Sequence, residues 1–207
     1  MCLFPFHLEN CSMQYPLSFT FKLLALAPQI YVKDAGGNWV CYVKQKLFKL
    51  KENIKVFADD SQTTPLCEIS ADRVIDWSAC YRITDAEGNS LGSVRRQGMR
   101  SLWKASYDIT DADDQPLATI REENAFVKVL DAIFSDLPVV GRLSGYVFHP
   151  KYLVSDTQDQ PLMRLTKRPA FFEGKFELEK LQEMDSVAEL GTIMSLLMMT
   201  LLEKRRG

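Results

Sequence analysis

The sequence is poor in the side chains from which most catalytic and metal sites are built. Among 207 residues the only histidines are His7 and His149, and the five cysteines include no Cys-x-x-Cys pair. No Gly-x-Ser-x-Gly elbow, glycine-rich phosphate loop or His-Glu-x-x-His motif occurs. These absences argue against a zinc site, a disulfide framework and the common hydrolase and nucleotide-binding classes. We therefore expect no cofactor, no bound metal and no enzymatic activity.

The chain also lacks an excess of charge of either sign, with 25 basic and 27 acidic side chains. Without an overall field it has no general attraction to nucleic acid, and we expect no such partner. The odd cysteine count and the absence of a secretory signal favour a cytoplasmic protein with free thiols. Residues 1–14 fit no strand or helix pattern and are expected to be a leader, with Met13 as an alternative start. Residues 15–207 are then expected to form one domain.

What the chain does contain is an internal repeat. Apolar residues stand four and two positions before each of five aspartates, and again six and nine positions after it. Each unit predicts a strand, a polar turn and a returning strand, because an aspartate side chain can accept hydrogen bonds from backbone N–H groups in the turn. The three-residue step in the returning strand breaks alternation and predicts a β-bulge. The five aspartates are Asp34, Asp60, Asp85, Asp111 and Asp156.

Alternating segments around Phe19 and Phe176 flank the five hairpins and raise the expected number of strands to about twelve. A sheet this wide exposes its edges unless it closes, so we predict a closed antiparallel β-barrel. The long step between the last two aspartates holds an insertion, residues 124–144, whose apolar residues fall on one helical face. It predicts one short amphipathic helix that ends at Pro138.

The C-terminal segment 186–204 predicts a helix that must be buried. Ser186 and Glu189 have the spacing of a capping box, and the thirteen residues from Leu190 to Leu202 carry no charge. A helix without a polar stripe has to be surrounded, and at 1.5 Å per residue this run is about 20 Å long, comparable with the height of a barrel. We therefore place it inside the barrel. The alternatives are a dimer interface, a sheet face, or a tail anchor, for which the run is short of about 20 residues.

Several segments resemble the LURP-one-related proteins, which belong to the tubby C-terminal-like superfamily together with the phospholipid scramblases. They are Lys44-Gln45-Lys46-Leu47-Phe48, Arg95-Arg96-Gln97-Gly98-Met99-Arg100-Ser101-Leu102-Trp103, Tyr107-Asp108-Ile109 and the terminal apolar helix. The resemblance covers nearly the whole chain, and it implies a twelve-stranded barrel threaded by that helix. Tubby domains bind phosphoinositides, whereas many LURP-one-related proteins have no assigned biochemistry. This chain lacks the proline-rich, cysteine-clustered N-terminus of scramblases, so lipid scrambling is not carried over.

Two groups of residues are candidate sites. Asp111, Asp113, Gln115 and Glu122 have an EF-hand-like spacing, but Pro116 replaces the required glycine, which favours a polar hairpin turn over a calcium site. Two basic stretches would form a cationic groove for phosphate headgroups if they are neighbours in the fold; ordinary solvated strand faces are the alternative. The residues of this predicted anion site are Lys44, Lys46, Arg95, Arg96, Arg100 and Lys104.

The resulting prediction is a non-catalytic binding or scaffold protein, cytoplasmic or peripheral at the membrane. Its expected partner is an anionic phospholipid or another phosphate-bearing ligand. A protein–protein interaction module without a small ligand is the alternative, and an enzyme is less favoured because no motif supports one.

Overall fold

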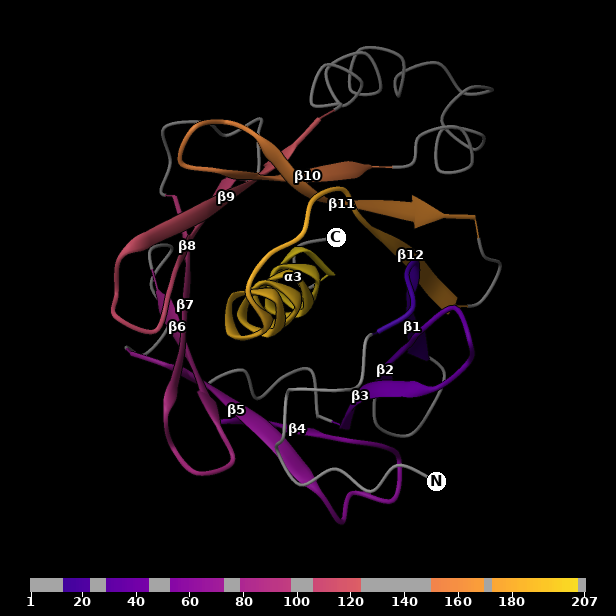
Figure 1. The fold of residues 1–207 in the computed structure, drawn as a ribbon. Helices are drawn as coiled ribbons and strands as arrows, with labels where there is room; N and C mark the ends of the chain where they lie inside the picture. Colours follow the sequence, from indigo (N-terminus) through magenta and orange to yellow (C-terminus); the bar gives the residue numbers. More distant parts are fainter. Residues whose placement is uncertain are drawn as a thin grey trace, which may run out of the picture.

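The computed structural model describes residues 13–22, 29–44, 53–72, 79–97, 106–123, 150–169 and 173–204. Within these ranges, twelve strands form one closed antiparallel barrel (Figure 1), which confirms the predicted fold class. The strands are β1 (Leu17–Lys22), β2 (Gln29–Lys33), β3 (Trp39–Lys44), β4 (Ile54–Phe57), β5 (Pro65–Ala71), β6 (Cys80–Asp85), β7 (Ser90–Arg96), β8 (Ser106–Thr110), β9 (Pro116–Glu122), β10 (Lys151–Asp156), β11 (Pro161–Arg168) and β12 (Glu173–Lys180). The C-terminal helix is α3 (Ser186–Lys204).

Each strand pairs with its neighbours in sequence, and β1 pairs with β12 to complete the ring. At this closure Leu17 lies opposite Leu178 and Phe19 lies opposite Phe176. Leu17, Phe19 and Leu178 are fully buried, and Phe176 is 7 % exposed. Both flanking strands predicted from alternation are therefore present, and closure leaves no unpaired edge at this point.

Four of the five predicted hairpins share one turn geometry. In the β6–β7 turn, the N–H of Asp85 donates to the carbonyl of Asn89 at 2.9 Å, and the N–H of Asn89 donates to Oδ1 of Asp85 at 2.7 Å. The equivalent bonds occur in three of the other four turns. All five turns place their fourth residue at positive φ, where glycine or a short polar side chain is favoured. These fourth residues are Gly37, Gln62, Gly88, Asp114 and Asp159.

One turn aspartate was predicted a residue too late. In the β4–β5 turn the side chain of Asp59, not that of Asp60, accepts the backbone N–H of Ser61 at 2.9 Å. This turn is two residues longer than the others, since it is closed by the N–H of Ala58 donating to the carbonyl of Thr64. The predicted bulges are confirmed in all five hairpins. Each appears as a shift of register after an inward residue of the first strand, namely Val32, Val56, Ile83, Ile109 and Val154.

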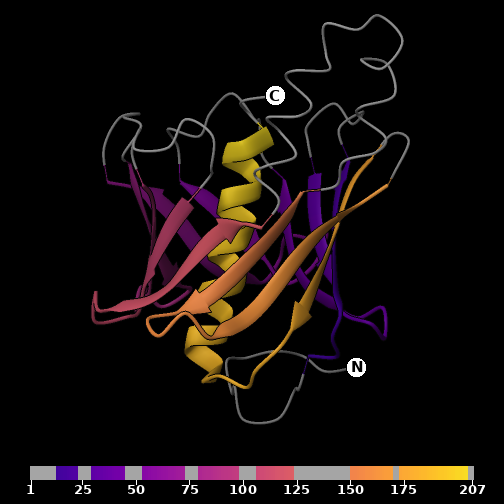
Figure 2. The ribbon, with the colours of Figure 1, turned by 90° about the horizontal axis from the view of Figure 1, so that it is seen from above.

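Helix α3 runs inside the barrel, surrounded by the strands (Figures 1 and 2), as predicted. Every residue from 191 to 201 is buried, and Met194, Met198 and Met199 are fully buried core residues. By length and composition Ser186–Glu203 could cross a membrane, but 67 % of it is buried inside the protein. The helix packs tightly against the wall at Gly191, where an added Cβ would lie 2.5 Å from the backbone oxygen of Leu91 in β7.

The predicted capping box is wrong at its first position. Asp185 caps the helix, because its Oδ2 accepts the N–H groups of Val187 at 3.0 Å and Ala188 at 3.1 Å. Glu189 serves a different purpose. Its carboxylate accepts the hydroxyl of Tyr15 at 2.7 Å and the ammonium of Lys180 at 2.9 Å, which ties the start of α3 to the barrel.

At the other end of α3, Oε1 of Glu203 accepts the hydroxyl of Tyr107 at 2.5 Å. Burial, helped by the nearby carboxylate, raises the pKa of Tyr107 well above its usual range. Burial and Glu189 raise the pKa of Tyr15 in the same way, so both phenols stay protonated and act as donors. The helix is thus held by a tyrosine–glutamate hydrogen bond at each end.

The predicted amphipathic helix in 124–144 and most of the predicted leader lie outside the described residues.

Candidate binding surface

The structure describes three of the six residues of the predicted anion site. Lys44 is exposed at the end of β3, and Arg95 is exposed on the outer side of β7. Strands β4, β5 and β6 separate them, which is four strand spacings, or about 19 Å along the barrel wall. The described residues therefore do not bring these two cations together. Lys46, Arg100 and Lys104 lie outside the described residues.

Arg96 is turned away from the outer surface. It lies two residues after the buried Val94 on the same side of β7, and it pairs in register with Tyr107 of β8. Its Nε is 3.9 Å from Oε1 of Glu203, which is too long for a hydrogen bond. Its guanidinium carbon is 6.0 Å from the centre of the Tyr107 ring. Arg96 therefore lines the mouth of the barrel beside the end of α3 and does not share a surface with Arg95.

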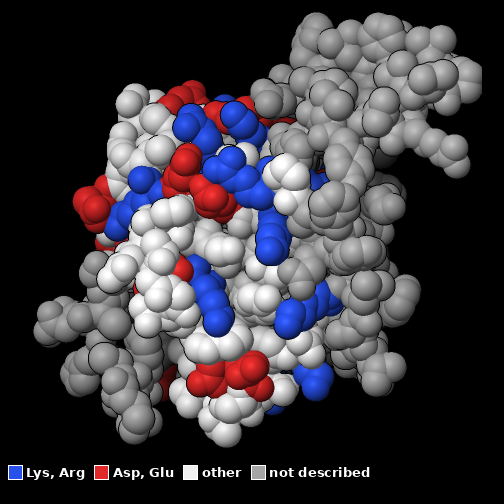
Figure 3. Space-filling model, turned by 90° about the vertical axis from the view of Figure 1, so that its right-hand side faces the viewer, with Lys and Arg blue, Asp and Glu red and all other residues white. Residues whose placement is uncertain are grey.

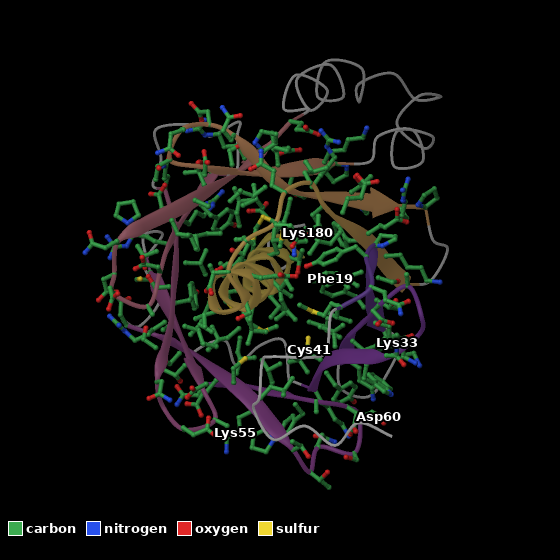
Figure 4. All side chains as sticks on the ribbon, viewed as in Figure 1. Phe19, Lys33, Cys41, Lys55, Asp60 and Lys180 are labelled. Carbon is green, nitrogen blue, oxygen red and sulfur yellow. The ribbon has the colours of Figure 1, made fainter. Side chains whose placement is uncertain are left out.

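A different group of cations lies on the outer wall. Inward residues of β1, β2 and β3, such as Val32, are buried, so the residues that alternate with them point outward. Figure 4 shows Lys33 pointing away from the barrel, whereas Phe19 and Cys41 point into it. We call this outer surface the lysine–aromatic face. It consists of Lys22, Tyr31, Lys33, Trp39, Tyr42 and Lys44.

The strand register places these side chains in rows. Gln29 of β2 lies opposite Lys22 of β1 on one side and opposite Lys44 of β3 on the other. The next outward residue of β2, Tyr31, lies opposite Tyr42 of β3. The aromatic residues are thus directly beside the lysines, on strands that are hydrogen-bonded to one another.

The lysines and aromatic rings are in contact. Nζ of Lys33 lies 4.4 Å from the centre of the Trp39 ring, and Nζ of Lys22 lies 5.3 Å from that of Tyr31, both within cation–π range. Trp39 packs edge-to-face between two tyrosines, with ring centroids 5.8 Å from Tyr31 and 6.1 Å from Tyr42. The rings hold one another and two of the ammonium groups in place.

The lysines of this face have no ion-pair partner among the described side chains, which do not include that of Glu173, opposite Lys22 in the strand register. None of Lys22, Lys33 and Lys44 forms an ion pair with another residue in the described part of the chain, whereas the neighbouring Glu177 is bound by Arg168 at 2.7 Å. Figure 3, which shows the side of the barrel formed by β12, β1, β2 and β3, has basic side chains across its middle, basic and acidic ones mixed near its top, and an acidic cluster near its bottom. The middle of this side is therefore positively charged.

The β4–β5 turn forms an acidic border to the face. Tyr42 is only 4 % exposed, and burial, followed by the nearby carboxylate of Asp60, raises its pKa. Lys55 of β4 is exposed and points outward beyond this border (Figure 4). Three lysines thus lie on β1 to β3, β4 adds Lys55 further along the wall, and the carboxylate of Asp60 in the β4–β5 turn lies at the edge of the face.

Sequence reasoning found Lys44 but missed Lys22, Lys33 and Tyr31. The prediction rested on basic residues that are close together in the sequence, whereas these residues come from separate strands. A signal was present, because Gln29 to Lys33 alternates between outward polar or aromatic residues and inward apolar ones. Combining that alternation with the predicted hairpin at Asp34 would have brought the lysines of β2 and β3 together.

The EF-hand-like segment is a hairpin turn, as the sequence favoured. Oδ1 of Asp111 accepts the backbone N–H groups of Asp113 at 2.9 Å and Gln115 at 2.8 Å, so this oxygen is engaged within the turn. Across the described ranges, no group of three or more His, Cys, Asp or Glu side chains is placed to hold a metal ion.

The model of the LURP-one-related family matches residues 40–141 of the chain. The match runs from β3 past the end of β9, whereas the barrel also requires the strands on either side of this range and the helix in its centre. No curated protein and no solved structure gives a significant match.

Proposed function

Because the chain belongs to the LURP-one-related family, we propose that it is a non-catalytic binding protein whose outer wall engages a phosphate-bearing anionic ligand. The ligand class is an anionic phospholipid headgroup or another molecule carrying phosphate. The observation that carries the proposal is the lysine–aromatic face, where three lysines on neighbouring strands have no carboxylate partner among the described residues. Ammonium groups in this state are available to phosphate oxygens.

The interior of the barrel supports a role for the outer wall. Small barrels that hold ligands usually do so inside, but here α3 fills the axis with side chains that are fully buried, among them Ile193, Leu196 and Leu197. Binding is therefore assigned to the outside. The same arrangement favours a scaffold over an enzyme, since catalytic sites are commonly concave and partly closed to water.

Vesicle flotation tests the proposal. We expect the protein to float with phosphatidylcholine vesicles that contain phosphatidylserine and not with pure phosphatidylcholine, and we expect recovery to fall as salt is added, because surface charge is screened. Substitution of Lys22, Lys33 and Lys44 by glutamine should abolish the difference. The matched control is Lys151→Gln, which removes an exposed lysine of β10, far from this face. Equal recovery with both vesicle types, together with no binding of a soluble phosphate ligand, would remove the proposal.

A further inference from the structure

The aromatic half of the lysine–aromatic face is not needed to bind a free phosphate. A dissolved anion would use the ammonium groups alone, yet Tyr31 and Trp39 are only half-buried although both are large and largely apolar. Tryptophan and tyrosine rings of this kind are most stable where one side is wet and the other apolar, as in the headgroup layer of a bilayer.

We infer that this face docks on the surface of an anionic phospholipid bilayer, with Trp39 and Tyr31 entering the headgroup layer. The inference rests on the proposed function and narrows its ligand from any phosphate to a membrane. Charge complementarity carries the choice, because the middle of this side presents basic side chains to the outside.

The placement of the cations agrees with a planar array of anions. Lys22 and Lys44 stand two strand spacings apart, about 10 Å at the backbone, with Gln29 between them. Lys33 lies near the other end of β2, and its ammonium is held over Trp39. Separate cations spread over three strands suit several headgroups in one plane better than a single phosphate, which needs its donors to converge.

The contacts between lysines and rings couple charge to insertion. Lys33 and Lys22 cover Trp39 and Tyr31 with hydrated ammonium groups. A lipid phosphate attracts those ammonium groups more strongly than a ring does, and their movement uncovers the ring faces at the level of the headgroups. Neutral vesicles offer no net negative charge to draw the lysines away, so the rings should enter anionic bilayers only.

The test uses the full chain with Trp39 as its only tryptophan, made by Trp77→Phe and Trp103→Phe, and vesicles whose acyl chains carry bromine as a quencher. We expect quenching and a blue shift of emission with vesicles containing phosphatidylserine, and neither with pure phosphatidylcholine. If the single-tryptophan protein does not fold, the quenching lost on Trp39→Phe in the otherwise native chain gives the same information. Lys33→Gln and Lys44→Gln should each weaken partitioning about fivefold, the equivalent of about 1 kcal/mol per basic residue.

Controls separate failure of the inference from failure of the proposed function. Lys151→Gln and Arg95→Gln, both on other walls of the barrel, should leave partitioning unchanged; an equal loss with either would overturn the assignment of the face. Binding to anionic vesicles without quenching of Trp39 would refute insertion and leave the proposed function standing. Binding of soluble glycerophosphoserine but not of vesicles would refute docking on a bilayer and also leave the proposed function standing. Absence of binding to both would refute the inference and the proposed function together.

Discussion

Replacing Gly191 with alanine provides a test of the buried helix in which two known effects have opposite signs. In an exposed helix, glycine to alanine stabilises by about 1 kcal/mol, because alanine has the higher helix propensity. Here the new Cβ would lie 2.5 Å from the backbone oxygen of Leu91, whereas ordinary contact begins at 3.4 Å. The helix or the strand must therefore shift by about 0.9 Å, the difference between these distances.

The clash should exceed the gain in propensity. The obstructing atom belongs to the backbone of β7, which is hydrogen-bonded to strands on both sides, so it cannot rotate away as a side chain would. Overpacking of a core costs about 1–3 kcal/mol, so after subtraction of the propensity gain we expect a net loss of up to about 2 kcal/mol for Gly191→Ala. Urea unfolding followed by circular dichroism gives the free energy of unfolding directly. Ala188→Gly, in the partly exposed first turn, calibrates propensity and should cost up to about 1 kcal/mol. Stabilisation by Gly191→Ala would contradict a helix packed against the inside of β7.

Three further outcomes are expected. Tyr107→Phe removes the hydroxyl that binds Glu203 and should lower the free energy of unfolding by about 1.5–3 kcal/mol, as measured in urea; an unchanged value would show that this hydrogen bond contributes nothing. Burial alone would raise the pKa of Asp34, but hydrogen bonds to its carboxylate outweigh burial and lower the pKa. The carboxylate therefore stabilises the fold above the pKa of the unfolded state, and this stabilisation is lost as the pH falls through the pKa of the folded state. Asp34→Asn should therefore flatten the acid limb of stability against pH, and an unaltered limb would refute the assignment. Burial raises the pKa of the Cys67 thiol to about 12 and raises that of Cys41 further. Peptide mapping after treatment with a thiol reagent at about pH 8 should therefore find both cysteines unmodified until urea unfolds the chain. Rapid labelling in the native state would contradict their burial.

The backbone of the barrel was predictable because it is encoded by local patterns repeated five times. The turn aspartates, the inward residues and the bulges follow from hydrogen bonding in a short turn and from side-chain alternation. Errors arose where two residues could fill one role. Asp59 and Asp60 are adjacent, as are Asp185 and Ser186, and in each case the first of the two is the one that binds the backbone.

The candidate surface was less predictable because it depends on which strands are neighbours. Arg95 and Arg96 are adjacent in sequence, yet alternation sends one outward and the other towards Glu203. Lys44 is four strands away from Arg95, although both stretches looked equally basic in the sequence. Charge along the chain therefore identified candidate residues, but only the strand register shows which of them share a surface.

Closure of the ring between β1 and β12 has a consequence for how the protein reaches its native state. These strands are separated by about 150 positions along the chain, so β1 cannot pair with β12 until nearly the whole chain has been synthesised. Until then the apolar inner wall has neither its last strand nor its central helix to cover it. During synthesis the unfinished barrel should be prone to aggregation and a natural client for chaperones, with assembly completed only when the final segments arrive.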